Sequence, residues 1–95
     1  MYKLEFTKSF FKDFRKLSKE VQREIVEKWF PRIQEKPDIG ERFVGHGLKS
    51  YLKIRVRFKK NDYRIVYQLY RKQLIILMIA VGTRENFYKR LERRL

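Results

Sequence analysis

The sequence predicts an α+β domain in which an N-terminal strand and a helical hairpin pack on an antiparallel β-sheet meander, with a C-terminal helix. Apolar residues recur at helical spacing in the first third of the chain, alternate with polar residues in the middle, and return to helical spacing at the end. The 95 residues suit one compact domain, 1–95. The 43 % of hydrophobic residues are enough for one core, so disorder throughout is not expected.

The N-terminal third is expected to form a short strand and two helices. Residues 2–6 alternate in hydropathy, as a half-buried strand does. Thr7 and Ser18 are expected to cap the helices that follow them. Pro31 should kink the second helix or divide it into two segments. The first apolar stripe is Phe10, Phe11, Phe14 and Leu17, and the second is Val21, Ile25, Trp29 and Ile33, joined by Val26 and Phe30.

The rest of the chain is expected to form a turn at 36–40, a short edge strand at 42–44, the meander and a final helix. Residues 53–59 alternate strictly, with three apolar side chains inward and four basic ones outward. Lys60-Asn61-Asp62 is expected as the hairpin turn before a return strand at 63–70. Residues 74–81 are apolar on both faces, which predicts a central strand. The final helix carries a stripe of Phe87, Leu91 and Leu95.

Charge is distributed unevenly along the chain. The net charge is +14, yet residues 1–41 hold ten basic and eight acidic residues, whereas residues 42–95 hold fifteen basic and three acidic residues. A folded half with this imbalance repels itself, and an anionic partner would relieve the repulsion. The sequence therefore favours a polyanion, most simply RNA, as partner of the C-terminal half. A basic protein without such a partner is the alternative.

Several classes of site are excluded by composition. Without cysteine there are no disulfides, zinc–thiolate sites or thiol nucleophiles. The single histidine, His46, lies between glycines and is expected in a bend. Carboxylates near the basic region are too few for a two-metal site. The longest apolar run has eight residues, against roughly 20 for a membrane span, and no secretory signal is recognisable, so a cytoplasmic protein is expected.

Basic side chains are expected to gather on the meander. Lys53, Arg55 and Arg57 share one strand face by alternation. Arg64 lies on the neighbouring strand, and the hairpin register, which the sequence leaves open, decides whether it joins them. Such a face can hold phosphate with or without catalysis, and spacing alone does not separate the two.

Arg84 and Tyr88 are four residues apart at the start of the final helix, so they are expected on one helical face. Cleavage of RNA without a metal needs a base for the ribose 2′-hydroxyl, cations around the phosphate and a proton for the leaving oxygen. Lysine and arginine side chains supply the positive charge around the phosphate directly. They also lower the pKa of a nearby tyrosine, which can then act as base.

Residues 51–56, 62–67 and 81–84, together with Tyr88, resemble the RelE/ParE toxin superfamily, and the predicted order of elements matches the RelE-like fold. The resemblance covers nearly the whole chain, and Tyr63-Arg64-Ile65-Val66-Tyr67 is its most specific part. It implies a toxin of a type II toxin–antitoxin system. RelE-like members cut mRNA in the ribosomal A site, whereas ParE-like members inhibit DNA gyrase and generally lack the cleaving residues.

Resemblance to the RelE-like branch implies an RNA endonuclease whose products carry a 2′,3′-cyclic phosphate. Tyr88 would be the general base, and Lys53, Arg64 and Arg84 would stabilise the phosphate, with Arg84 a candidate to assist the leaving oxygen. Arg55 stands where some members have lysine, so its part in proton transfer is in doubt. Further RNA contacts are assigned to Lys49, Arg57, Lys59 and Lys89. No metal or cofactor is implied.

The partners implied by the resemblance are a cognate antitoxin, mRNA and the ribosome with its 16S rRNA. The antitoxin is expected to have an acidic amphipathic segment and to form a hetero-oligomer with this protein. Operator DNA is expected to be bound only by that complex. No membrane partner is implied. The alternatives are a ParE-like gyrase inhibitor and a non-catalytic RelE-fold corepressor that binds nucleic acid.

Overall fold

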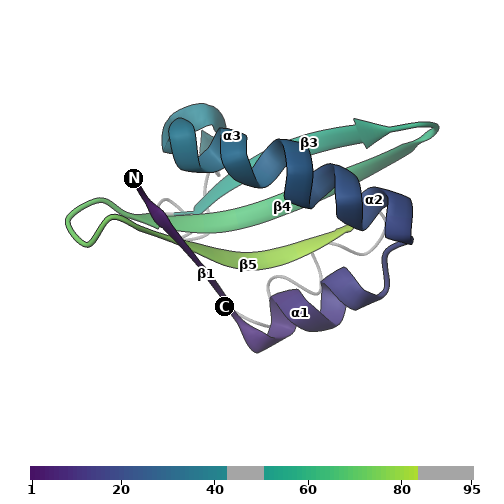
Figure 1. The fold of residues 1–95 in the computed structure, drawn as a ribbon, viewed down its shortest axis with the longest axis horizontal. Helices are drawn as coiled ribbons and strands as arrows, with labels where there is room; N and C mark the ends of the chain where they lie inside the picture. The colour runs from purple at the N-terminus through teal and green to yellow at the C-terminus, as the bar shows by residue number, and fades with distance from the viewer. Residues whose placement is uncertain (43–50, 84–95) are drawn as a thin grey trace.

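The computed structural model describes residues 1–42 and 51–83. Within them, three helical segments and a five-stranded sheet form the α+β architecture that the sequence predicted (Figure 1). The final helix expected after Thr83 lies outside the described residues. The strands are β1 (Lys3–Phe6), β2 (Glu41–Arg42), β3 (Tyr51–Phe58), β4 (Asn61–Tyr70) and β5 (Ile75–Thr83).

The strand order in the sheet is β1-β5-β4-β3-β2. Antiparallel pairing of β3 with β4 and of β4 with β5 confirms the meander. β5 lies between β1 and β4, as expected for a strand that is apolar on both faces. β1 joins the same sheet as the parallel partner of β5. At the other edge β2 pairs with Leu52 and Lys53. The edge strand was expected at 42–44, and of these residues only Arg42 is among those described.

The β3–β4 hairpin turn differs from the prediction. Asn61 already pairs with Phe58, so the turn consists of Lys59 and Lys60 alone and not of residues 60–62. A two-residue hairpin turn requires positive φ, and Lys59 has a φ of 56°. Its ammonium group forms an ion pair with Glu20 and lies 5.7 Å from the centre of the Phe58 ring. These contacts hold a lysine where glycine or asparagine is usual.

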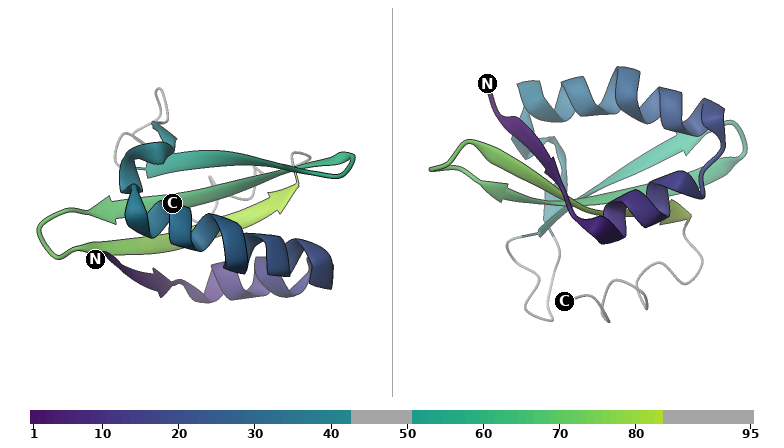
Figure 2. Two further views of the ribbon diagram at one scale, coloured as in Figure 1. Left: turned by 45° about the horizontal axis from the view of Figure 1, so that its top comes forward. Right: turned by 60° about the horizontal axis from the view of Figure 1, so that its bottom comes forward.

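All three α-helical segments lie on one face of the sheet (Figure 2). Thr7 caps α1 (Lys8–Arg15), since its Oγ1 accepts a hydrogen bond of 3.0 Å from Phe10 N. Ser18 caps α2 (Lys19–Glu24) through a bond of 3.3 Å from Val21 N. Both caps were predicted. Two members of the predicted apolar stripes, Phe11 and Val26, are about half exposed.

The second predicted helix is divided before Pro31, as the proline suggested. α2 passes through a π-helical turn, Ile25–Trp29, into α3 (Phe30–Glu35). Phe30 N–H donates to the carbonyl of Ile25, five residues back. Pro31 has no N–H, and in a regular α-helix its ring would clash with the carbonyl of Glu27. The wider turn just before Pro31 is one of the recognised ways to accommodate it.

The core lies between the helices and the sheet. Its fully buried members include Phe10, Ile25, Ile33, Val56, Ile65, Tyr67, Ile76 and Met78. The Tyr67 hydroxyl donates to the carbonyl of Pro37 (2.7 Å) and accepts from the N–H of Gly40 (3.0 Å). This buried side chain thereby ties the segment before β2 to the middle of the sheet. None of the described helices has the length and hydropathy that a membrane span needs.

Candidate nucleic-acid interface

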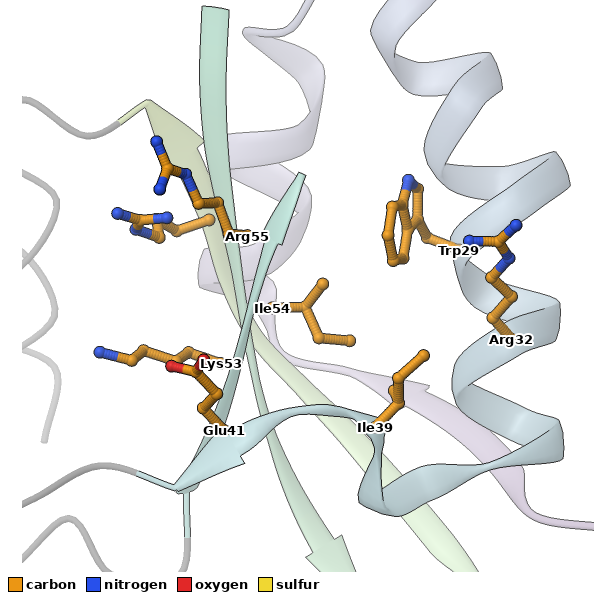
Figure 3. A pocket seen from close by; sticks show the side chains of 8 residues that line it. Trp29, Arg32, Ile39, Glu41, Lys53, Ile54 and Arg55 are labelled. Atoms are coloured by element: carbon orange, nitrogen blue, oxygen red, sulfur yellow. The ribbon is translucent and has the colours of Figure 1, made fainter. Parts of the chain in front are cut away.

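The alternation of β3 gives the sheet a basic second face, opposite the helices. Leu52, Ile54 and Val56 are buried in the core. Lys53 and Arg55 project from the other side of β3, whereas Ile54 points toward Trp29 of the helical layer (Figure 3). The inward and outward sets predicted for this strand are therefore confirmed up to Phe58.

The hairpin register brings Arg64 onto the same basic face. Arg55 and Arg64 are direct cross-strand partners, so their side chains lie on the same side of the sheet. Arg64 is in turn the partner of Gly82 on β5, which offers no side chain beside it. Like charges directly opposite each other destabilise a sheet. This row of Arg55, Arg64 and Gly82 thus sacrifices stability for a concentration of positive charge, as expected of an anion-binding surface.

Asp62 is an acidic residue of this face, as is Glu41, the cross-strand partner of Lys53. Asp62 is the cross-strand partner of Arg57, and its Oδ2 accepts a hydrogen bond of 2.8 Å from Arg55 Nη2. This bond is the largest influence on the carboxyl pKa and lowers it, and the charges of Arg57 and Arg64 lower it further. Asp62 is therefore a carboxylate at neutral pH. The same pairing raises the pKa of Arg55.

Two polar atoms of the face are buried without a hydrogen-bond partner: Arg64 Nε and Asp62 Oδ1. In the part of the chain that the structure describes, neither Arg57 nor Arg64 forms an ion pair or a hydrogen bond through its side chain. A donor without an acceptor is costly in the interior, and an added oxygen acceptor would relieve the cost. Arg64 thus has unused capacity to bind an anion.

A cavity of about 430 Å³ adjoins the basic face, and its lining residues include side chains from both faces of β3. Its lining on the basic side includes Glu41 and Lys53, next to the two cross-strand arginines. Its lining on the helical side is Trp29, Arg32, Ile39 and Ile54 (Figure 3). The basic face is therefore hollowed where three of its cations lie.

Of the residues assigned to the site from the sequence, Lys53, Arg55, Arg57 and Arg64 share this face. Lys59 instead lies in the hairpin turn with its ammonium group on Glu20 of α2. Arg84, Tyr88, Lys49 and Lys89 lie outside the described residues.

Asp62 was not singled out from the sequence as part of the site. The signal was present, because residues two apart on a strand share a face and Asp62 precedes Arg64 by two. Glu41 beside Lys53 was also not anticipated. The position of Glu41 depends on the pairing of β2 with β3, and the two residues of β2 show no alternation of apolar and polar side chains.

Helix α1 supports the end of β5 next to this face. β1 ends opposite Met78, and among residues 1–42 and 51–83 no other strand pairs with β5 on that side. Thr7 Oγ1 donates to the carbonyl of Ile79 (3.2 Å), and the buried Asp13 accepts from Val81 N–H (3.2 Å). These bonds give hydrogen-bond partners to the Ile79 carbonyl and the Val81 N–H on the edge of β5 just before Gly82. The position of the row thus depends on α1 as well as on the sheet.

Metal binding finds no support in residues 1–42 and 51–83, which contain no group of three or more histidine, cysteine or acidic side chains that could hold an ion. The chemistry available on the described part of the face is electrostatic: several fixed cations, the carboxylates of Asp62 and Glu41, and a guanidinium donor, Arg64 Nε, without a partner. This set suits the stabilisation of phosphate charge.

A family model described as the ParE-like toxin of type II bacterial toxin–antitoxin systems matches residues 4–92. The chain belongs to this family. The toxin is 33 % identical over 85 residues to the mRNA interferase toxin RelE of Escherichia coli K12, covering 90 % of this chain and 85 % of that protein. This confirms membership of the RelE/ParE superfamily.

Solved structures agree with this assignment. The isolated E. coli RelE toxin matches the whole toxin, 100 % of each chain, with a TM-score of 0.72 at 28 % identity. RelE in the intact E. coli RelBE toxin–antitoxin complex matches with a TM-score of 0.73 at 30 % identity, over 90 % of this chain and 99 % of that one. The toxin therefore has the RelE-like fold that its sequence predicted.

Proposed function

We propose that this toxin is a ribosome-dependent, metal-independent endonuclease that cleaves mRNA in the ribosomal A site and so inhibits translation. The observation that carries the proposal is the grouping of Lys53, Arg55 and Arg64 on one face of the sheet, which we call the basic row. Arg55 lies directly opposite Arg64, and Lys53 lies two residues from Arg55 on the same face. The relatives identified by activity are mRNA interferases.

In the proposed reaction the ribose 2′-oxygen attacks the adjacent phosphorus and the bond to the 5′-oxygen breaks. The products are a 2′,3′-cyclic phosphate and a 5′-hydroxyl. Tyr88 would take the proton of the 2′-hydroxyl, and cations close to a tyrosine favour the phenolate that this role needs. The leaving 5′-oxygen takes up a proton, with Arg84 assisting.

The basic row would stabilise the phosphorane. Lys53, Arg64 and Arg84 neutralise the charge that builds up on its oxygens, and Arg55 contributes charge alone, since guanidinium does not readily release a proton. Arg64 Nε, which is buried and without an acceptor, is a ready donor for a phosphate oxygen. Gly82, the partner of Arg64, is followed in the sequence by Thr83, where β5 ends. Arg84 is the next residue after Thr83.

We infer that the cognate partner is an antitoxin with an acidic amphipathic segment, bound in a hetero-oligomer. The related RelE occurs in a structure with its antitoxin. Fifteen basic against three acidic residues in 42–95 favour an acidic ligand that screens the basic face. Operator DNA would be contacted only through that complex, and the toxin would act in the cytoplasm on mRNA and the ribosome with its 16S rRNA.

The proposal is tested by primer extension on a translated message after induction of the toxin. We expect growth arrest and new 5′ ends within codons for the wild type. Both should disappear in the double variant Tyr88→Phe with Arg84→Ala, which removes the base and one phosphate ligand. The matched control is Arg71→Ala, a substitution of an arginine in the β4–β5 turn, which should remain toxic.

Three other outcomes would contradict the proposal. Toxicity of the double variant would mean that the assigned residues are wrong. Intact mRNA together with a DNA-damage response would indicate gyrase as the target. The absence of growth arrest would indicate a binding module without catalysis.

A further inference from the structure

Asp62 is an acid among the arginines of the basic face, at the hairpin end of β4. Its neighbours on the face are Arg55, which it binds, Arg57, which is its cross-strand partner, and Arg64, two residues along β4. Its side chain is about one quarter exposed, whereas that of Arg55 is more than half exposed. A site built only to attract phosphate would not need a carboxylate at this point.

The Arg55–Asp62 bond is of a kind that a ligand can exchange. Only one carboxylate oxygen takes part, because Oδ1 has no partner, so the bidentate geometry of the strongest arginine–carboxylate pairs is absent. Phosphate is a better match for guanidinium, since it offers several acceptor oxygens and can reach Arg64 as well. A phosphate seated on the row would therefore compete with Asp62 for Arg55.

We propose that Asp62 is a specificity-determining residue: its carboxylate occupies Arg55 as an internal competitor, and an RNA phosphate must displace it to bind. A phosphate that contacts Lys53, Arg55 and Arg64 together can do so. A polyanion that reaches only one or two of these cations is repelled by the carboxylate. The inference rests on the proposed function only in taking RNA as the ligand.

The test is the salt dependence of binding to a single-stranded oligoribonucleotide that is 2′-O-methylated throughout and therefore cannot be cleaved. Affinity is measured by fluorescence anisotropy between 50 and 200 mM salt for the wild type and Asp62→Asn. Asp62→Asn should bind more tightly, because Arg55 no longer has to be released. The gain should be roughly 1.5- to 5-fold, the equivalent of releasing one exposed ion pair. The slope of log affinity against log salt should be the same for both proteins, because the phosphate contacts Arg55 in each of them, so the gain should persist at 200 mM salt.

Asp38→Asn is the matched control. It removes the same charge and also releases an arginine, because Asp38 pairs with Arg71 on exposed residues away from the row. Its gain in affinity should be smaller than that of Asp62→Asn and should disappear at 200 mM salt, because the effect of a distant exposed charge is screened. A thermal melt of each variant establishes that the fold is retained, which is expected because Asp62 lies beside a turn at the start of β4.

The proposal is overturned if Asp62→Asn gains no more affinity at 200 mM salt than Asp38→Asn, since Asp62 would then contribute only net charge. Weaker binding by Asp62→Asn would also overturn it, because the carboxylate would then merely orient Arg55. In the double variant Asp62→Asn with Arg55→Gln the gain should vanish, and a gain that persists there would overturn the proposal too. Because binding is measured without cleavage, an inactive wild type that shows the affinity difference would refute the nuclease proposal and leave this one standing.

Discussion

The contact between Tyr67 and Gly40 shows how one residue can fix the approach to β2. A Cβ at Gly40 would lie 2.7 Å from the Tyr67 hydroxyl and 3.1 Å from both Leu52 Cβ and the Lys53 carbonyl. Gly40→Ala should therefore lower the free energy of unfolding by about 1–3 kcal/mol through overpacking. Tyr67→Phe should also cost about 1–3 kcal/mol, since it leaves Gly40 N–H and the Pro37 carbonyl unpaired.

Urea denaturation of the two single variants and the double variant measures both effects. Because Tyr67→Phe removes the closest atom that the alanine methyl would meet, the double variant should lose less than the sum of the single losses. Strict additivity would mean that the clash lies with the β3 backbone and not with the hydroxyl.

The same hydroxyl makes stability depend on alkaline pH. Burial raises the pKa of Tyr67 to about 12, from 10 in the unfolded chain. Between these values the folded state holds a proton that the unfolded state has lost, so this contribution is complete below pH 10 and disappears as pH approaches 12. The loss should amount to about 2–3 kcal/mol. Denaturation at a series of pH values should show this excess decline in the wild type relative to Tyr67→Phe, and parallel curves would contradict it.

At the scale of elements, α1 stabilises β5 where no strand covers it. Asp13→Ala should leave Val81 N–H without an acceptor and cost about 1–3 kcal/mol, whereas Asp13→Asn keeps an acceptor oxygen and should cost less. Hydrogen exchange should show faster exchange of the Val81 amide in Asp13→Ala alone. Equal protection in both variants would mean that the β4 side of the ladder suffices to hold this strand end.

The elements themselves were largely predictable. The caps at Thr7 and Ser18, the alternation of β3 and the double-sided apolar character of β5 are local signals, and each was confirmed. The hairpin turn was displaced because Lys59 adopts positive φ with the help of Glu20, a residue 39 positions away. Local turn preferences contain no information about such a partner.

At the scale of the whole molecule, the sequence predicted which cations lie on β3 but not which neighbours they meet. The pairing of Arg55 with Arg64 follows from the length of one turn, and a different turn would have separated them. β1 beside β5 and Asp13 beneath Val81 are contacts between distant parts of the chain. The excess of basic residues in the C-terminal half could be predicted from the sequence. That Asp62 lies among the arginines became known only from the register of β3 and β4.

The π-helical turn has a consequence for how this chain can change in length. An α-helix advances about 100° per residue, so Val21 and Ile33, twelve residues apart, would face directions about 120° apart in an unbroken helix. Both are nevertheless buried in one core, together with Ile25 between them. The π turn contains one more residue than an α-helical turn, and this extra residue brings Val21 and Ile33 back to the same side of the helix. It behaves as a single-residue insertion that the fold has accommodated. Deleting one residue from 25–29 would therefore restore a regular α-helical turn and leave Ile33 facing the sheet, because Val21 and Ile33 would then be eleven residues apart and only about 20° out of phase. Adding a residue elsewhere between Val21 and Ile33 would instead rotate α3 by about 100° and turn Ile33 away from the core.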